Sequence, residues 1–373
     1  MTSRPRQHAR IVFAVTAHGL GHIVRTLLVI RELQTLCRDV EIIISTGVDP
    51  KTIARFLPQP FSYRSKHYEP GTIQKNSFEL DPAATRSRYR TLFQERAQDL
   101  SAETEFLKQT GCRGLVSDIP ALPIKAAADL GIPTVGLSNF TWDWILQPIF
   151  AGESSNEIPG QLTTEYASGD LHLKLPFGPA DSPFRVSEPV PLVARTATQP
   201  ALSVRKLLSL PEQGSPTLVV VCPGGWDPEG WQRISVQNDD GRFFYVFVGD
   251  LPIDCTGPHL HLPHELMPGL SFPDLVNGAD MVLAKPGYGI ASECLLHQTP
   301  AVFIERPDFR ETPLLVEEFS KGGRCAEVSL ADFFAGRWTA SIERVLLDTS
   351  PWRIPPRNGA QLVAERLASF FGW

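Results

Sequence analysis

Short apolar runs alternate with segments of helical periodicity along most of the chain. The run Arg10–Val15 is typical of a buried strand, and Val40–Ser45 is a second one. Between them, apolar residues recur every third or fourth position, at Ile23, Leu27, Ile30, Leu33 and Leu36. This strand–helix–strand pattern predicts a βαβ unit, the building block of parallel sheets covered by helices.

The same pattern recurs twice further along the chain, in two stretches that resemble each other. One runs through Gly114–Asp118, Ile124–Leu130 and Pro133–Leu137, and the other through Met281–Lys285, Ile290–His297 and Ala301–Ile304. Leu218–Val221 and Phe243–Val248 add strands to the second series. A proline-rich stretch at 176–200 lies between the two series and is typical of a linker.

These elements predict an α/β protein with two doubly wound, Rossmann-like domains facing a central cleft. The first domain is expected at residues 1–190 and the second at 191–350. Residues 351–373 contain a helical pattern from Gly359 to Phe371, expected to pack back on the first domain.

Composition narrows the possible functions. The 373 residues carry a net charge of −6, which disfavours a broad nucleic-acid surface. No apolar run reaches the roughly 18 residues needed to span a membrane, although peripheral contact stays open. The six cysteines are scattered singly without metal-ligand spacing, which favours free thiols in a cytoplasmic protein.

The loop after the Met281–Lys285 strand has the composition of a phosphate site. Lys285, Gly287, Tyr288 and Gly289 lead into a helix whose first backbone N–H groups favour an anion. Glu293 lies one turn further on, within reach of a sugar hydroxyl. Gly224 and Gly225 form a similar turn after Leu218–Val221. An ordinary turn that binds nothing remains the alternative.

The loop HGLGH follows the first strand and supplies two candidate bases, His18 and His22, with Gly21 between them. It is not GxGxxG, and no acidic residue ends the second strand, so a nicotinamide cofactor is not expected. A metal site is disfavoured because no third ligand stands near the two histidines.

A third group of polar residues follows the strands of the first domain. Asp118 and Asn139 are expected at the same sheet edge as His22, where α/β proteins bind ligands. Trp142 and Asp143 suit a pocket wall for an acceptor. The alternative is that the tryptophan merely packs in the core.

Taken together, the motifs resemble GT-B glycosyltransferases. HGLGHIVRT, SDIP, SNFTWDW, VVVCPGGWDPEGW and the 271–311 stretch look like the glycosyltransferase-like N-terminal domain of plant L-arabinokinases, over about residues 10–350. More loosely, the chain is similar to the UDP-N-acetylglucosamine transferase of peptidoglycan synthesis. No sugar-kinase domain is expected, and therefore no arabinose phosphorylation.

The looser resemblance implies roles for particular residues. His22 matches the loop histidine of that enzyme, and Ser292 and Glu293 match a helix pair whose glutamate holds the ribose. Phe272 falls where uracil is contacted, and Glu311 where the donor sugar is held. His18 stands where that enzyme has glycine, which leaves open which histidine is the base.

The resemblance implies an inverting transferase that moves a sugar from a UDP-sugar to an acceptor hydroxyl or amine. No cofactor or metal is expected, because Asp-x-Asp is absent and a helix N-terminus can stabilise the leaving diphosphate. The alternatives are a sugar-nucleotide-binding module without turnover, and a nucleotide-sugar epimerase or hydrolase on the same fold. The sequence names neither sugar nor acceptor.

Overall fold

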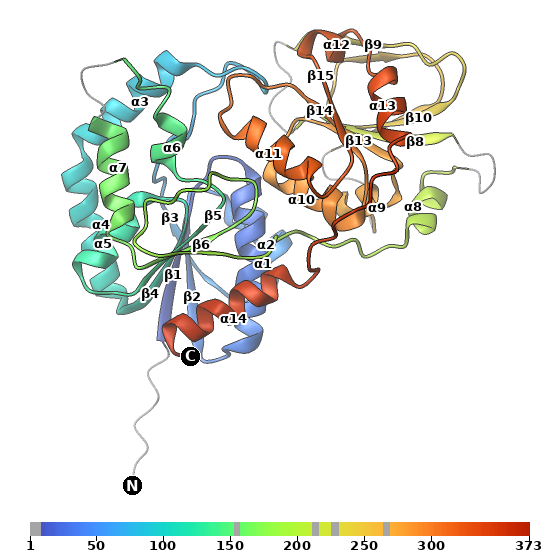
Figure 1. Cartoon of the computed structure of the whole chain (residues 1–373). Helices are drawn as coiled ribbons and strands as arrows, with labels where there is room; N and C mark the ends of the chain where they lie inside the picture. Colours follow the sequence, from blue (N-terminus) through green and yellow to red (C-terminus); the bar gives the residue numbers. More distant parts are fainter. Residues whose placement is uncertain (1–8, 153–156, 211–215, 225–230, 264–268) are drawn as a thin grey trace. The chain divides into compact units, whose positions relative to one another are not determined.

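The computed structural model describes residues 9–152, 157–210, 216–224, 231–263 and 269–373, and the chain divides into two units. Unit 1 comprises Met1–Ile73, Asp81–Val193 and Asn358–Trp373. Unit 2 comprises Gln74–Leu80 and Ala194–Arg357. Each unit is built around its own parallel sheet (Figure 1).

The sheet of unit 1 has seven strands in the order β3-β2-β1-β4-β5-β6-β7, all paired in parallel. The side chains of Ile11–Val15 in the central strand are fully buried. Covering both faces of a parallel sheet with helices requires such continuous apolar runs. The strands are β1 (Ala9–Val15), β2 (Val40–Thr46), β3 (Ser62–Ser65), β4 (Cys112–Asp118), β5 (Thr134–Ser138), β6 (Leu171–Lys174) and β7 (Ser187–Pro189).

The helices of unit 1 lie in two groups. The first group packs together as α1 (Leu20–Leu36), α2 (Pro50–Phe56) and α14 (Gly359–Phe371). Figure 1 shows the other group on the opposite side of the sheet: α3 (Pro82–Gln94), α4 (Arg96–Thr110), α5 (Ala121–Asp129), α6 (Trp142–Leu146) and α7 (Glu157–Ala167). Asp49 and Asp81 start α2 and α3 by accepting backbone N–H groups, each followed by a proline suited to the first turn.

The main sheet of unit 2 has six strands in the order β12-β10-β8-β13-β14-β15, and β11 and β9 form a separate pair. Its central strands β8 and β13 are again almost entirely buried. The strands are β8 (Thr217–Cys222), β9 (Ile234–Val236), β10 (Phe243–Val248), β11 (Ile253–Cys255), β12 (His259–Leu262), β13 (Met281–Ala284), β14 (Ala301–Ile304) and β15 (Cys325–Val328).

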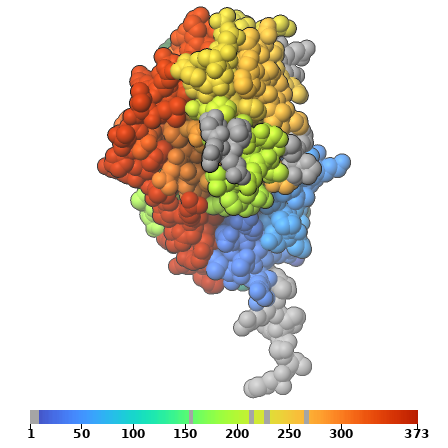
Figure 2. Space-filling model, turned by 90° about the vertical axis from the view of Figure 1, so that its right-hand side faces the viewer, coloured from blue at the N-terminus to red at the C-terminus, as the bar shows by residue number. Residues whose placement is uncertain are grey.

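The helices of unit 2 are mostly short. They are α8 (Ala201–Leu207), α9 (Phe272–Gly278), α10 (Tyr288–His297), α11 (Glu311–Ser320), α12 (Leu330–Phe334) and α13 (Thr339–Leu346). Ser271 and Asp274 form a reciprocal capping box that begins α9. Helix α8 lies at the surface, yellow-green in Figure 2, where Leu202 is 70% exposed.

The segment Gln74–Leu80 belongs to unit 2 although the chain on both sides of it builds unit 1. Phe78 anchors this segment in the core of unit 2. It is buried against the rings of Trp231, Phe333 and Phe334, at centroid distances of 5.2, 5.7 and 5.8 Å. This segment could not be predicted from periodicity, because a polar loop with one phenylalanine has none.

The strands expected from the apolar runs are present, and the differences lie in the loops and connections. The stretch expected as linker contains β7, and the passage to unit 2 comes after Val193 and returns at Asn358. Among the described residues, no helix is long and apolar enough to cross a membrane.

Candidate active site

The first candidate site lies at the carboxyl edge of the sheet in unit 1. Helix α1 begins at Leu20, so His22 is in its first turn, and Asp118 is the last residue of β4. β1 and β4 are neighbours, with Val15 opposite Asp118, so the turn that follows β1 arrives beside this carboxylate. His22 Nδ1 lies 2.8 Å from Asp118 Oδ1.

Asp118 is fully buried and receives hydrogen bonds from several side chains. Arg25 donates through Nε to Oδ2 at 2.7 Å and through Nη2 to Oδ1 at 2.6 Å, and Thr26 Oγ1 donates to Oδ2 at 2.9 Å. Burial alone would raise the pKa of Asp118, but the charges and hydrogen bonds of Arg25 and His22 hold it well below its usual range. The carboxylate is therefore ionised at neutral pH.

Two groups contact Nδ1 of His22: Asp118 Oδ1 at 2.8 Å, which can only accept, and Arg25 Nη2 at 2.9 Å, which can only donate. In the tautomer that donates to Asp118, Nδ1 carries the proton and Nε2 has the lone pair. Nε2 makes no hydrogen bond to any residue that the structure describes. A histidine oriented by a buried carboxylate and with one free nitrogen is the arrangement of a general base.

Two residues expected to contact an acceptor are instead part of this buried network. Asp118 is fully buried and Asn139 is 1% exposed. Asn139 Oδ1 accepts from Arg25 Nη1 at 2.7 Å, and its Nδ2 donates to the carbonyl of Phe177 at 3.2 Å. Their position at the sheet edge was expected, but burial excludes direct contact with an acceptor in this structure.

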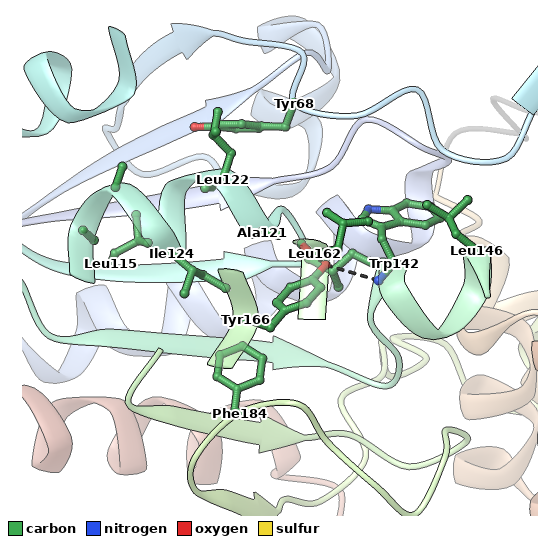
Figure 3. Close-up of a cluster of buried hydrophobic side chains, with 14 of the residues drawn as sticks. Tyr68, Leu115, Ala121, Leu122, Ile124, Trp142, Leu146, Leu162, Tyr166 and Phe184 are labelled. Atoms are coloured by element: carbon green, nitrogen blue, oxygen red, sulfur yellow. Dashed lines mark hydrogen bonds between the residues drawn. The ribbon is translucent and has the colours of Figure 1, made fainter. Parts of the chain in front are cut away.

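His18 and Trp142 lie against each other, with ring centroids 5.5 Å apart in an edge-on arrangement. Thr72 Oγ1 is 3.5 Å from His18 Nε2. Trp142 is 1% exposed and packs in the apolar cluster of unit 1, where its backbone N–H donates to the hydroxyl of Tyr166 (Figure 3). Trp142 is therefore a core residue, as the structural alternative proposed.

Asp143 is only partly buried. Its Oδ2 accepts from Thr163 at 2.8 Å, while its Oδ1 has no hydrogen-bond partner among the described residues. The hydrogen bond from Thr163 to Asp143 Oδ2 thus links α7 to α6.

The sequence reasoning missed Arg25 and Thr26. A signal existed, because they follow His22 by three and four positions and therefore lie on the same face of α1. Polar residues on the buried face of a helix need partners inside the protein. Thr26 and Arg25 are 0% and 3% exposed.

The second candidate site lies at the carboxyl edge of the sheet in unit 2, where β13 leads into α10. Helix α10 begins at Tyr288 after Gly287, without a side-chain cap for its first N–H groups. A Cβ added at Gly287 or Gly289 would meet no atom within 4 Å, and neither glycine has a left-handed backbone. The space over these backbone groups is thus open, as phosphate binding at a helix N-terminus requires.

Glu293 lies further along α10 and is 2% exposed. Its Oε1 accepts from Arg195 Nε at 2.6 Å, and its Oε2 has no hydrogen-bond partner among the described residues. Burial raises the pKa of Glu293, and Arg195 opposes the shift. Ser292, fully buried beside it, also has a hydroxyl without such a partner. The described residues thus leave one side-chain oxygen of Ser292 and one of Glu293 unpaired.

Most of the other predicted donor residues lie in the same unit. Lys285 follows β13, Phe272 begins α9, Glu311 begins α11, and Tyr288 is buried at the start of α10. Gly224 has φ +112°, a backbone conformation that favours glycine, and a Cβ there would lie 2.4 Å from Lys285 Cε. Gly225 lies outside the described residues. Gly21, predicted beside the donor, is exposed in the first turn of α1 in unit 1.

The two parallel sheets define the fold as that of the GT-B glycosyltransferases, and solved structures share it. CalG4, the calicheamicin glycosyltransferase, matches with a TM-score of 0.62 and 17% identity, over 98% of this chain and 99% of that one. MurG of Acinetobacter baumannii matches with a TM-score of 0.55 and 12% identity, over 97% and 99%. Phytolacca americana UGT2, solved with UDP-2fluoro-glucose and pterostilbene, matches with a TM-score of 0.58 and 11% identity, over 97% and 94%.

Sequence relatives agree with the fold. L-arabinokinase of Arabidopsis thaliana is 29% identical over 371 residues, which cover 98% of this chain and 35% of that protein. The chain thus spans about a third of the length of this relative. An uncharacterized glycosyltransferase of Methanopyrus kandleri is 22% identical over 268 residues, 69% of this chain and 74% of that protein. No protein-family model matches the sequence. The comparisons confirm the predicted GT-B fold and support the predicted transferase class.

Proposed function

We propose that the protein transfers a sugar from a UDP-sugar to an acceptor hydroxyl or amine, with inversion at the anomeric carbon. The observation that carries the proposal is the pair of His22 and Asp118, because a histidine that donates through Nδ1 to this carboxylate has Nε2 available to take a proton. One structural neighbour was solved with a UDP-sugar analogue, which supports the choice of UDP-sugars as donors to test.

The chemistry divides between the two sites. His22 Nε2 removes the proton of the acceptor as its oxygen or nitrogen attacks the anomeric carbon, and Asp118 stabilises the imidazolium that forms. The C–O bond to the diphosphate breaks in the same step. The uncapped N–H groups at the start of α10 then stabilise the negative charge on the leaving diphosphate.

The assignment of the base is tested by replacing His22. His22→Ala should reduce turnover by a factor on the order of 10²–10⁴, while UDP still binds. His18→Ala is the matched control from the same loop and should mainly raise the KM of the acceptor. Full turnover in His22→Ala at saturating donor and acceptor would exclude this role. Loss of turnover in His18→Ala alone would assign the role of general base to His18.

Metal independence follows from the same account of the leaving group. If the helix N-terminus and neighbouring cations stabilise the diphosphate, transfer should continue after incubation with EDTA. Activity would be followed as UDP release from a panel of UDP-sugars with and without sugar acceptors. Complete loss with EDTA that manganese restores would contradict the account, and equal UDP release without any acceptor would indicate a hydrolase instead.

A further inference from the structure

Two basic side chains lie at the carboxyl edge of the sheet in unit 2. Lys285 directly follows β13, and Arg306 lies two residues after β14. These strands are neighbours, with Ala284 opposite Phe303, so the two cations follow adjacent strand ends beside the start of α10. Lys285 was expected at this edge from the sequence, whereas Arg306 was not.

Both cations are held in surroundings that disfavour their charge. Lys285 is half-buried, and this burial, with the nearby Arg306 acting in the same direction, lowers its pKa to about 8. Arg306 is only 4% exposed, and this burial lowers its pKa to about 10, while Glu311 acts in the opposite direction. The positive charges of Lys285 and Arg306 exceed the single negative charge of Glu311, so this edge carries a net positive charge.

The contacts of these side chains are mostly apolar. The guanidinium of Arg306 lies 3.2 Å from the centroid of the Phe309 ring, and its Nε has no hydrogen-bond partner among the described residues. Lys285 lies against Gly224. In the described part of the chain, no carboxylate is within ion-pair distance of either cation.

A buried cation without a paired carboxylate destabilises the folded protein unless a ligand supplies the missing anion. We propose that Lys285 and Arg306 form an anion subsite for a negative group of the donor, next to the phosphate held at the start of α10. The inference rests on the proposed function and adds a requirement on the donor. The group is either the second phosphate of the nucleotide or the carboxylate of an acidic sugar.

The first test uses inorganic pyrophosphate, which needs no nucleotide site. Pyrophosphate should raise the melting temperature of the wild-type protein, and this shift should be lost in Arg306→Gln and Lys285→Gln but kept in Arg306→Lys. Arg233→Gln is the control, because Arg233 is an exposed arginine of the same unit whose side chain is 74% exposed. An equal shift in wild type and both glutamine variants would overturn the subsite.

The second test separates the two sources of the anion by calorimetric titration of UMP, UDP, UDP-glucose and UDP-glucuronate. If the second phosphate binds here, Arg306→Gln should lose about tenfold or more of the preference for UDP over UMP. If a sugar carboxylate binds here, the loss should fall on the preference for UDP-glucuronate over UDP-glucose. Arg306→Lys should retain part of either preference.

The two tests also distinguish the subsite from the proposed function. Unchanged preferences in both variants, with UDP still bound, would remove the subsite and leave the transferase proposal standing. A pyrophosphate shift that depends on Arg306, in a protein that binds no uridine nucleotide, would support the subsite and remove the UDP-sugar donor.

Discussion

Asp118 shows how one buried carboxylate can serve both stability and chemistry. Its two oxygens receive Arg25, Thr26 and His22, all from α1, so the carboxylate fixes the start of this helix against the end of β4. The same network orients the ring of His22 through its Nδ1. Removing the carboxylate should therefore affect folding before it affects catalysis.

Asp118→Ala would leave the guanidinium of Arg25, which is 3% exposed, without its carboxylate. Breaking a buried pair in this way should lower the free energy of unfolding by about 3–5 kcal/mol, measured by urea denaturation. Asp129→Ala is the matched control, since its partner Lys125 is on the surface of α5, and it should cost less than about 1 kcal/mol. Equal losses in the two variants would contradict the buried-pair account.

A second buried carboxyl of unit 1, Glu69, behaves in the opposite sense. Its Oε1 accepts from the backbone of Ala121 at 3.2 Å, and its Oε2 has no hydrogen-bond partner among the described residues. Burial raises the pKa of Glu69 from its ordinary 4.5 to about 8, although Arg96 opposes the shift. The group is therefore protonated in the folded protein near neutral pH.

Between pH 4.5 and about 8 the folded chain binds a proton at Glu69 that the unfolded chain has released. The contribution of Glu69 to stability is therefore present below the unfolded pKa and lost as pH rises through this window. Glu69→Gln should remove this pH dependence. The free energy of unfolding of the variant, relative to that of the wild type, should therefore increase as pH rises from about 5 to about 8. Urea denaturation across this range measures the difference, and parallel curves would show that Glu69 is ionised in the fold.

At the scale of elements, the start of α10 is the feature most directly open to test. Gly289→Val should fit the unoccupied fold, because a Cβ there meets nothing within 4 Å and the backbone is not left-handed. Its side chain would occupy the space above the helix N-terminus and weaken UDP more than uridine, as measured by calorimetry. Equal weakening of both ligands would place the phosphate elsewhere.

The strands and the principal helices could be predicted because their apolar periodicity is strong, as in β10 and β14, whose bounds agree with the expected ones. Short elements such as α6 were missed because five residues carry too little periodicity. The loop histidines and the glycine turn were found as motifs. The roles of Asp118 and Asn139 were not, because their burial depends on Arg25, which is distant in sequence.

At the scale of the whole molecule, neither unit is a continuous stretch of chain. Unit 1 consists of three stretches and unit 2 of two, so the chain passes between them four times. Phe78 completes the core of unit 2 from a loop that follows β3 of unit 1, and α14 returns to pack on α1.

Phe78→Ala should therefore destabilise unit 2 although the residue lies within the first hundred of the chain. Loss of a buried phenylalanine costs about 3–5 kcal/mol. Hydrogen exchange followed by mass spectrometry should show faster exchange in β8, β10 and β13, with β1 and β4 unchanged. Leu347→Ala, at a residue of unit 2 that is 81% exposed, should leave all of them unchanged. Faster exchange confined to unit 1 would contradict the placement of this segment.

The return of α14 to α1 also has a consequence for synthesis on the ribosome. The side chains of Val363, Ala364 and Leu367 are fully buried, and they belong to α14, which follows the strands of both units along the chain. Until these residues emerge, the surface of α1 that they cover stays bare, while the strands of unit 2 have already been made. A nascent chain therefore presents this apolar surface to chaperones while unit 2 is being made, and unit 1 can close only after α14 has emerged.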